Sequence, residues 1–249
     1  YDALYGTDVI DESNGKEITK KYNPVRGKAV IKYAAKVLDD ACALQAASHS
    51  DVLEYNIEAG DLTVTLKNDS VTTLLDKSKF VGYQGPIENP STILLKNNNL
   101  HIELHIDRKH SIGRDNPSGL KDVVMEAAIT TIQDFEDSVA AVDADDKAKI
   151  YENFLGLTRG NLTESFEKNG KMITRSLNHD KKYIAPNGES FELAGRSLLL
   201  VRNVGHLMTT PAILDKDGNE VPEGIMDALF SGLICLHDLR GKSANTNSQ

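Results

Sequence analysis

Two predominantly apolar stretches that end abruptly in charged residues place the strongest constraint on the fold of this chain. Residues 129–135 lead directly into Glu136, and residues 197–204 contain the run LLLV immediately before Arg202. Continuous apolar runs of this length are typical of strands that are buried on both faces, as in a parallel sheet covered by helices. The chain is therefore expected to contain part of a parallel sheet.

The segments around these two strands have helical patterns. Helices are predicted over residues 147–157, after the first strand, and over residues 223–240, after the second. Ser118 is in position to cap a further helix over residues 119–127. A helix, a buried strand and another helix in succession predict β/α units with a parallel sheet.

The remainder of the chain is rich in short alternating segments. Apolar residues at three- and four-residue steps predict one amphipathic helix over residues 25–48. The other segments predict hairpins, because they are joined by Asn, Gly or Asp residues that tolerate the conformations of tight turns. The predicted hairpins cover residues 52–66, 92–106, 165–177 and 183–193.

Charge and composition exclude several classes of protein. The 249 residues include 28 Lys and Arg against 37 Asp and Glu, and a net charge of -9 is the wrong sign for gripping a phosphate backbone. No apolar stretch approaches the ~20 residues of a membrane span. We therefore expect no nucleic-acid or membrane partner and a cytoplasmic location. Cys42 and Cys235 lie in apolar helical patterns and are expected to be buried thiols.

Acidic residues gather where the first apolar strand ends. Asp134, Glu136 and Asp137 precede Ser138, and the carboxyl end of a buried parallel strand is where α/β sheets and barrels keep their sites. Such carboxylates could ligate a hard cation such as Mg²⁺, or bind its waters. Alternatively, they only cap the following turn and helix. The residues alone support both interpretations.

Arg202 occupies the matching position at the end of the second apolar strand. A desolvated guanidinium keeps its charge and needs an anionic partner. A carboxylate substrate, or oxygen charge that develops in a transition state, would suit its planar fork. The alternative partner is an Asp or Glu on a neighbouring strand. The placement at a second strand end favours a functional role.

Two other patterns carry weaker signals. His101, Glu103, His105 and Asp107 alternate with apolar residues and could form a metal ladder, but the wet face of a half-buried strand is the favoured interpretation. Residues 215–220 resemble the start of a calcium loop, yet their glycine is fourth rather than sixth, which favours a simple turn.

Long motifs in this chain resemble the malate synthase G family, and the similarity runs through essentially the whole chain. They comprise residues 124–147 (VMEAAITTIQDFEDSVAAVDADDK), 169–175 (NGKMITR), 198–208 (LLLVRNVGHLM) and 224–232 (GIMDALFSG). The resemblance implies condensation of glyoxylate with acetyl-CoA, followed by thioester hydrolysis to malate and CoA. It also implies Mg²⁺ as cofactor of the complete enzyme, which is expected to be monomeric.

Site residues carry over from the family position by position. Arg202 matches the arginine that binds glyoxylate and stabilises the oxygen charge, and is the expected catalytic residue. Ser138 and Arg175 match positions associated with acetyl-CoA. Glu136 and Asp137 match acidic residues beside the metal and its waters. The family's direct Mg²⁺ ligands and its aspartate base match nothing in this chain.

The resemblance implies an α+β / α/β fold class, namely a β-rich α/β insertion domain with two β/α segments of an incomplete TIM barrel. Residues 1–126 and 160–197 are assigned to the inserted domain, and residues 127–159 and 198–249 to the barrel. Two barrel strands of eight cannot close a barrel.

Because the chain resembles only about a third of the family's length and begins at Tyr1, we expect an internal fragment that is inactive by itself. Two other functions remain open. One is a Mg²⁺-dependent aldolase or lyase on a related barrel, and the other is a non-catalytic interaction module.

Overall fold

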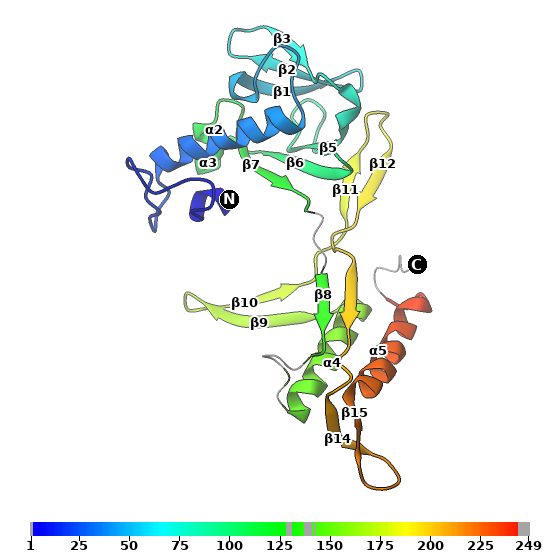
Figure 1. The fold of residues 1–249 in the computed structure, drawn as a ribbon. Coiled ribbons are helices and arrows are strands. Elements are labelled where there is room, and N and C mark those ends of the chain that lie inside the picture. The colour runs from blue at the N-terminus through cyan, green and yellow to red at the C-terminus, as the bar shows by residue number, and fades with distance from the viewer. Residues whose placement is uncertain (1, 128–130, 137–140, 142, 244–249) are drawn as a thin grey trace. The chain divides into compact units, whose positions relative to one another are not determined.

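The computed structural model describes residues 2–127, 131–136, 141 and 143–243 (Figure 1). The chain divides into two compact units. The first comprises Tyr1–Ala128 with Lys181–Leu193, and the second comprises Ile129–Asp180 with Ala194–Gln249. Each unit therefore combines segments that are distant in sequence.

The first unit is built on antiparallel sheets. A six-stranded sheet has the order β12-β11-β4-β5-β6-β7, and a three-stranded sheet has the order β1-β2-β3. Its strands are β1 (Val52–Glu58), β2 (Asp61–Leu66), β3 (Val71–Thr73), β4 (Phe80–Gln84), β5 (Thr92–Asn97), β6 (Leu100–Ile106), β7 (Leu120–Met125), β11 (Lys181–Ile184) and β12 (Ser190–Leu193). Its helices are α1 (Asp2–Tyr5), α2 (Pro24–Ala41) and α3 (Ser111–Asp115), with single 3₁₀ turns at His49–Asp51 and Lys77–Lys79.

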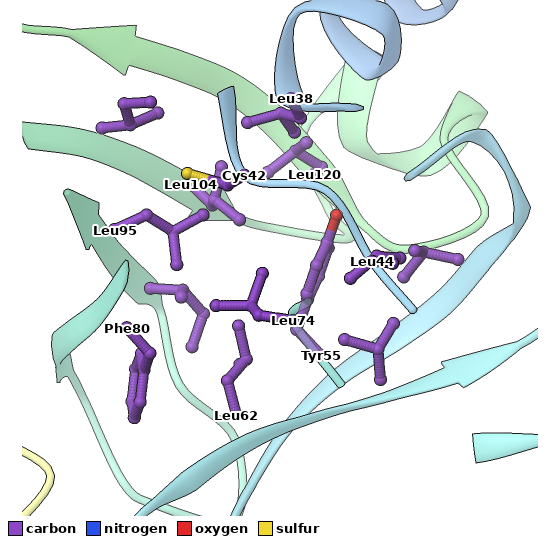
Figure 2. Close-up of a cluster of buried hydrophobic side chains, with 14 of the residues drawn as sticks. Leu38, Cys42, Leu44, Tyr55, Leu62, Leu74, Phe80, Leu95, Leu104 and Leu120 are labelled. Atoms are coloured by element: carbon purple, nitrogen blue, oxygen red, sulfur yellow. The ribbon is translucent and has the colours of Figure 1, made fainter. Parts of the chain in front are cut away.

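The core of this unit lies between helix α2 and the two sheets. Figure 2 shows Leu38 and Cys42, from the end of α2, close to Leu104 and Leu120 of the large sheet. Leu62 and Leu74 add apolar side chains from the region of the small sheet. Alternation on β2 and β6 sends every second side chain into this cluster, as expected for strands with one buried face.

The second unit contains the parallel strands that the apolar runs predict. β8 (Thr131–Asp134) and β13 (Leu199–Arg202) pair in parallel, with Arg202 opposite Asp134. Each strand is followed along the chain by a long helix, α4 (Ala144–Arg159) or α5 (Glu223–Leu239). Phe135, Phe154 and Ile234 form the core between them. Two hairpins complete the unit: β9 (Thr163–Lys168) with β10 (Lys171–Ser176), and β14 (Thr209–Leu214) with β15 (Glu220–Pro222).

The described residues contain no closed barrel, since β8 and β13 pair only with each other. The mixed architecture agrees with an α/β insertion domain and an additional parallel pair. Within the described ranges, no helix is long and apolar enough to cross a bilayer.

All four predicted hairpins are confirmed, and their turns use the expected residues. Asn98 and Asn99 connect β5 to β6 with φ of 50° and 64°, and Asn169 and Gly170 connect β9 to β10 with φ of 54° and 73°. Positive φ at both central positions matches the right-handed twist of the flanking strands.

The predicted helix over residues 119–127 is wrong. Residues Leu120–Met125 form strand β7, which pairs along β6. Gly119 has φ of +76°, and Ser118 donates from its hydroxyl to Asn116 instead of capping a helix. Local helix signals are weak against cross-strand pairing. Here β7 forms the edge of the sheet, and pairing with β6 satisfies the backbone hydrogen-bonding groups on one side of the segment.

Helix α2 ends earlier than the periodicity predicts. It stops at Ala41, because Leu44 forms a β-bridge with Leu74 and the chain turns away.

Residues 160–197 were assigned to one domain, but the structure divides them between the two units. Lys181–Leu193 packs in the first unit through the Ile184–Tyr83 pairing, whereas β9 and β10 pair only with each other and belong to the second. The identity of these segments as inserted domain or barrel stays a prediction.

A buried histidine makes the stability of the first unit sensitive to acid. His49 is 6% exposed; its Nε2 donates to the Cys42 carbonyl, so Nδ1 accepts from the Tyr55 hydroxyl, at 2.8 Å each. Burial lowers the pKa of His49, against a smaller opposing effect of the bond to Cys42. The neutral ring is therefore the folded form, and the unfolded chain binds the proton more readily.

We expect the free energy of unfolding to fall as the pH drops below about 6.5, by roughly 1 kcal/mol per unit of pKa difference. Urea unfolding at pH 7.5 and 5.5 measures this loss. His49→Gln should flatten the dependence between these two pH values, and His206→Gln, at an exposed position of the second unit, should not. An unchanged pH dependence in His49→Gln would contradict the assignment.

Candidate functional site

The carboxyl ends of β8 and β13 bring the predicted acidic residues and Arg202 together. The Arg202 Nε donates to Asp134 Oδ1 at 2.9 Å, and Nη2 donates to Asp134 Oδ2 at 2.6 Å. Nη2 also lies 3.0 Å from Glu136 Oε2. In-register parallel pairing causes this meeting, because it places Arg202 directly opposite Asp134. We call Arg202, Asp134 and Glu136 the strand-end cluster.

The strand-end cluster is open to solvent on one side. The Arg202 side chain is 52% exposed, and the Asp134 and Glu136 side chains are 39% and 40% exposed. The hydrogen bonds from Arg202 lower the pKa of Asp134. An exposed pair of this kind contributes little to the stability of the fold, so its main consequence is the orientation of the guanidinium.

The guanidinium retains donors for a ligand. Its five N–H groups include two on Nη1, whereas the contacts to Asp134 and Glu136 use Nε and Nη2. The ion pair with a neighbouring strand, which the sequence left open as an alternative, is therefore present. It leaves the two N–H groups of Nη1 available for an anion.

The other predicted site residues are separated or lie outside the described ranges. Arg175 is on β10, where its guanidinium stacks on the Phe166 ring at 4.8 Å. Asp137 and Ser138 fall outside the described residues. The structure thus brings Arg202 and Glu136 together and places Arg175 on a separate hairpin.

The structure agrees with the favoured interpretations of two weaker patterns, namely a strand face at His101, Glu103, His105 and Asp107 and a simple turn at residues 215–220. Glu103 accepts from Lys181 at 2.6 Å and contacts His105 at 2.7 Å. Burial opposes ionisation, but the bonds from His105 and Lys181 prevail and lower the pKa of Glu103 to about 2. Residues 215–219 form a turn in which Asp215 accepts from the Asn219 amide. No group of three or more His, Cys, Asp or Glu side chains in the described part of the chain could hold a metal.

Sequence reasoning missed a buried polar cluster beneath the strand ends. It contains Lys147, Tyr151, Glu223 and Asp227, from helices α4 and α5. One signal was available, because Asp227 interrupts the otherwise apolar run GIMDALF and lies four residues after Glu223, on the same helix face.

Taken together, the fold and the strand-end cluster define an α/β chain whose candidate site lies at the carboxyl ends of parallel strands. Residues 22–97 match the family model described as "Malate synthase G, alpha-beta insertion domain". The chain is 51% identical to malate synthase G of Halalkalibacterium halodurans, 49% to that of Corynebacterium efficiens and 50% to that of Corynebacterium glutamicum. In each case the match covers 100% of this chain and 33–34% of the relative.

The chain is therefore similar along its whole length to part of malate synthase G, as the resemblance in its motifs predicts. It spans about a third of the length of the curated relatives that it matches.

Proposed function

We propose that the full-length polypeptide carrying this sequence condenses glyoxylate with acetyl-CoA and water to give malate and CoA. One observation carries this proposal: a half-exposed arginine is held by a carboxylate at the end of a parallel strand, in a chain about 50% identical to malate synthase G. An acyltransferase of this kind needs a fixed cation that meets an oxo-acid and the oxygen charge formed from it.

In this proposal Arg202 is the catalytic residue. Its Nη1 group binds the glyoxylate carboxylate or the developing alkoxide, while Asp134 and Glu136 hold Nε and Nη2 in place. A carboxylate base takes a methyl proton from acetyl-CoA, and the resulting enolate carbon attacks the aldehyde carbon of glyoxylate. Water then cleaves the thioester and releases malate and CoA. The base belongs to the longer protein, as does the remainder of the barrel.

Two further residues are proposed to bind acetyl-CoA, namely Ser138 and Arg175. Arg175 is exposed on β10, so its guanidinium is accessible to an anionic group such as a phosphate. Its stacking on Phe166 limits the conformations of the side chain.

The family resemblance also implies Mg²⁺, but the described residues do not form a complete site for it. Asp134 and Glu136 supply the oxygen atoms that Mg²⁺ prefers, yet both carboxylates already contact Arg202. The described residues contain no group of three or more His, Cys, Asp or Glu side chains that could hold a metal ion. We propose that Glu136 and Asp137 lie beside the metal of the complete enzyme.

The proposed setting is that of a monomeric cytoplasmic enzyme with acetyl-CoA and glyoxylate as its small-molecule partners. The net charge of -9 supports the absence of a nucleic-acid partner.

The 249-residue chain alone is expected to release no CoA thiol above background from acetyl-CoA, glyoxylate and Mg²⁺. Its two parallel strands leave the sheet open, so that groups from further strands are missing from the site. The full-length polypeptide should form malate under the same conditions, with identification of the product by mass. Turnover by the short chain would contradict the first expectation, and a full-length protein without malate formation would contradict the proposed function.

A further inference from the structure

A buried lysine connects the end of strand β8 to helix α5. The Lys147 residue is 6% exposed, and its Nζ donates to the Phe135 carbonyl at 2.7 Å. The same Nζ lies 2.7 Å from Glu223 Oε1 and 2.9 Å from Asp227 Oδ1. Lys147 comes from the first turn of α4, so one ammonium group joins α4, the strand end and α5.

Asp227 makes the corresponding connection to strand β13. It is fully buried, and its Oδ2 accepts from the Val204 amide at 2.8 Å. Its Oδ1 accepts from the Tyr151 hydroxyl as well as from Lys147. Burial, and then the bond to Asp227, raises the pKa of Tyr151, so the phenol stays a donor.

These contacts lie directly beside the strand-end cluster. Phe135 follows Asp134 and precedes Glu136, and its amide donates to the Arg202 carbonyl at 2.9 Å. Val204 is two residues after Arg202. The main chain on both sides of the cluster is therefore fixed by side chains of α4 and α5.

The energetics point to a geometric role for this ionic group. Removing charges from water carries a large desolvation penalty for each ion, and a buried ionic group is often no more stable than apolar packing of the same volume. What the ionic group adds is direction, since its N–H and O–H donors are aimed at acceptors in set positions on the strand end and the two helices.

We propose that Lys147 and Asp227 are positioning residues that hold the ends of β8 and β13 in register, so that Arg202 meets its oxo-acid ligand in one orientation. This inference rests on the proposed function for its consequence in catalysis. Its structural part, the fixing of Phe135 and Val204, is independent of that function.

The principal test is Asp227→Asn in the full-length polypeptide that carries this sequence. This change keeps the size of the side chain and leaves the Lys147–Glu223 pair intact, so the protein should fold. We expect kcat/KM for glyoxylate to fall about 10²-fold, as for misplacement of a reacting group by ~1 Å, with KM for acetyl-CoA changed less than about twofold. Lys147→Met should likewise lower kcat/KM for glyoxylate while changing KM for acetyl-CoA little.

A matched control is Ile234→Ala, which removes buried apolar volume from α5 without touching the ionic group. It should lower the melting temperature and leave both KM values unchanged. The inference is overturned if Ile234→Ala reproduces the loss for glyoxylate, or if Asp227→Asn changes only the melting temperature.

Amide hydrogen exchange on the 249-residue chain tests the structural part separately. Asp227→Asn should speed exchange of the Val204 and Phe135 amides about tenfold, and leave the amides of the β9–β10 hairpin unchanged. Unchanged exchange at Phe135 overturns the inference even if the full-length protein proves inactive. If the wild-type protein makes no malate but these amides respond, the proposed function fails and the positioning of the strand ends stands.

Discussion

Replacing Arg202 by Gln in the full-length polypeptide is expected to lower kcat/KM for malate formation about 10³-fold. Loss of one preorganised donor to an oxyanion lowers kcat by about 10²–10³-fold, and this change also removes the cation that binds the substrate. The fold should survive, because the pairs that Arg202 makes with Asp134 and Glu136 are exposed and contribute little to stability. Steady-state kinetics beside a thermal melt separates the two effects.

Two further variants sharpen the Arg202 test. Arg202→Lys keeps the charge but loses the planar fork, so it should recover only a small part of the activity. Arg159→Gln removes an exposed arginine at the end of α4 and should leave the activity unchanged. Near-normal activity in Arg202→Gln would remove Arg202 from the proposed mechanism.

The electrostatic consequence of the same variant is visible without substrate. The hydrogen bonds from Arg202 lower the pKa of Asp134, so they add stability that is present above the unfolded value near 3.8 and is lost as the pH falls toward the folded value. In Arg202→Gln the Asp134 pKa should rise toward its ordinary value. Carboxyl chemical shifts followed through an acid titration would report this change.

Apolar periodicity was sufficient to predict the parallel pair and both long helices of the second unit. β13 (LLVR) is largely apolar, but β8 (TIQD) is not. Neither strand is buried on both faces as the apolar runs predict, since Ile132 is 53% and Leu200 is 50% exposed. The sequence predicted only that Arg202 and Asp134 lie at the same edge of a sheet. The pairing register that places them directly opposite each other could not be derived from these two strands alone. The resemblance added the roles of Arg202, Ser138 and Arg175, which no spacing rule supplies.

The features that escaped prediction depend on tertiary contacts. Strand β7 has a helix-compatible sequence, and only the neighbouring edge of β6 makes it a strand. Lys147 and Asp227 are 80 residues apart, and a lysine near a helix start usually indicates a solvated surface. The role of Arg26 was equally invisible, since it lies among lysines and polar residues at the start of α2.

Arg26 organises the polar segment that precedes α2. The residue is 1% exposed, and its guanidinium donates only to backbone carbonyls among the contacts described. Nε donates to the Leu4 carbonyl at 2.6 Å, and Nη2 donates to the Ile10 carbonyl at 3.0 Å. Its remaining acceptors are the carbonyls of Ala3, Gly6, Asp11 and Lys16. Six carbonyls thus share one buried cation, and the loop over residues 6–16 wraps around it.

Replacing Arg26 by Met should therefore release the whole segment. The change leaves these carbonyls without their donor, and each buried acceptor that stays unsatisfied costs about 1–3 kcal/mol unless water reaches it. Water can reach them only if the loop opens. We expect local unfolding of residues 2–22 and a loss of about 3–5 kcal/mol in the free energy of unfolding of the first unit. Limited proteolysis and amide exchange of these residues provide the measurement.

A matched control lies on the same helix. Lys28→Met removes an exposed cation two residues further along α2 and should change neither proteolysis nor the unfolding midpoint. Arg26→Lys discriminates charge from geometry, because an ammonium group has three donors and cannot span carbonyls that surround a planar fork. It should behave like Arg26→Met in proteolysis. A protease-resistant segment in Arg26→Met would show that the loop is held by Asn23, whose amide donates to the Gly15 and Glu17 carbonyls, rather than by the guanidinium.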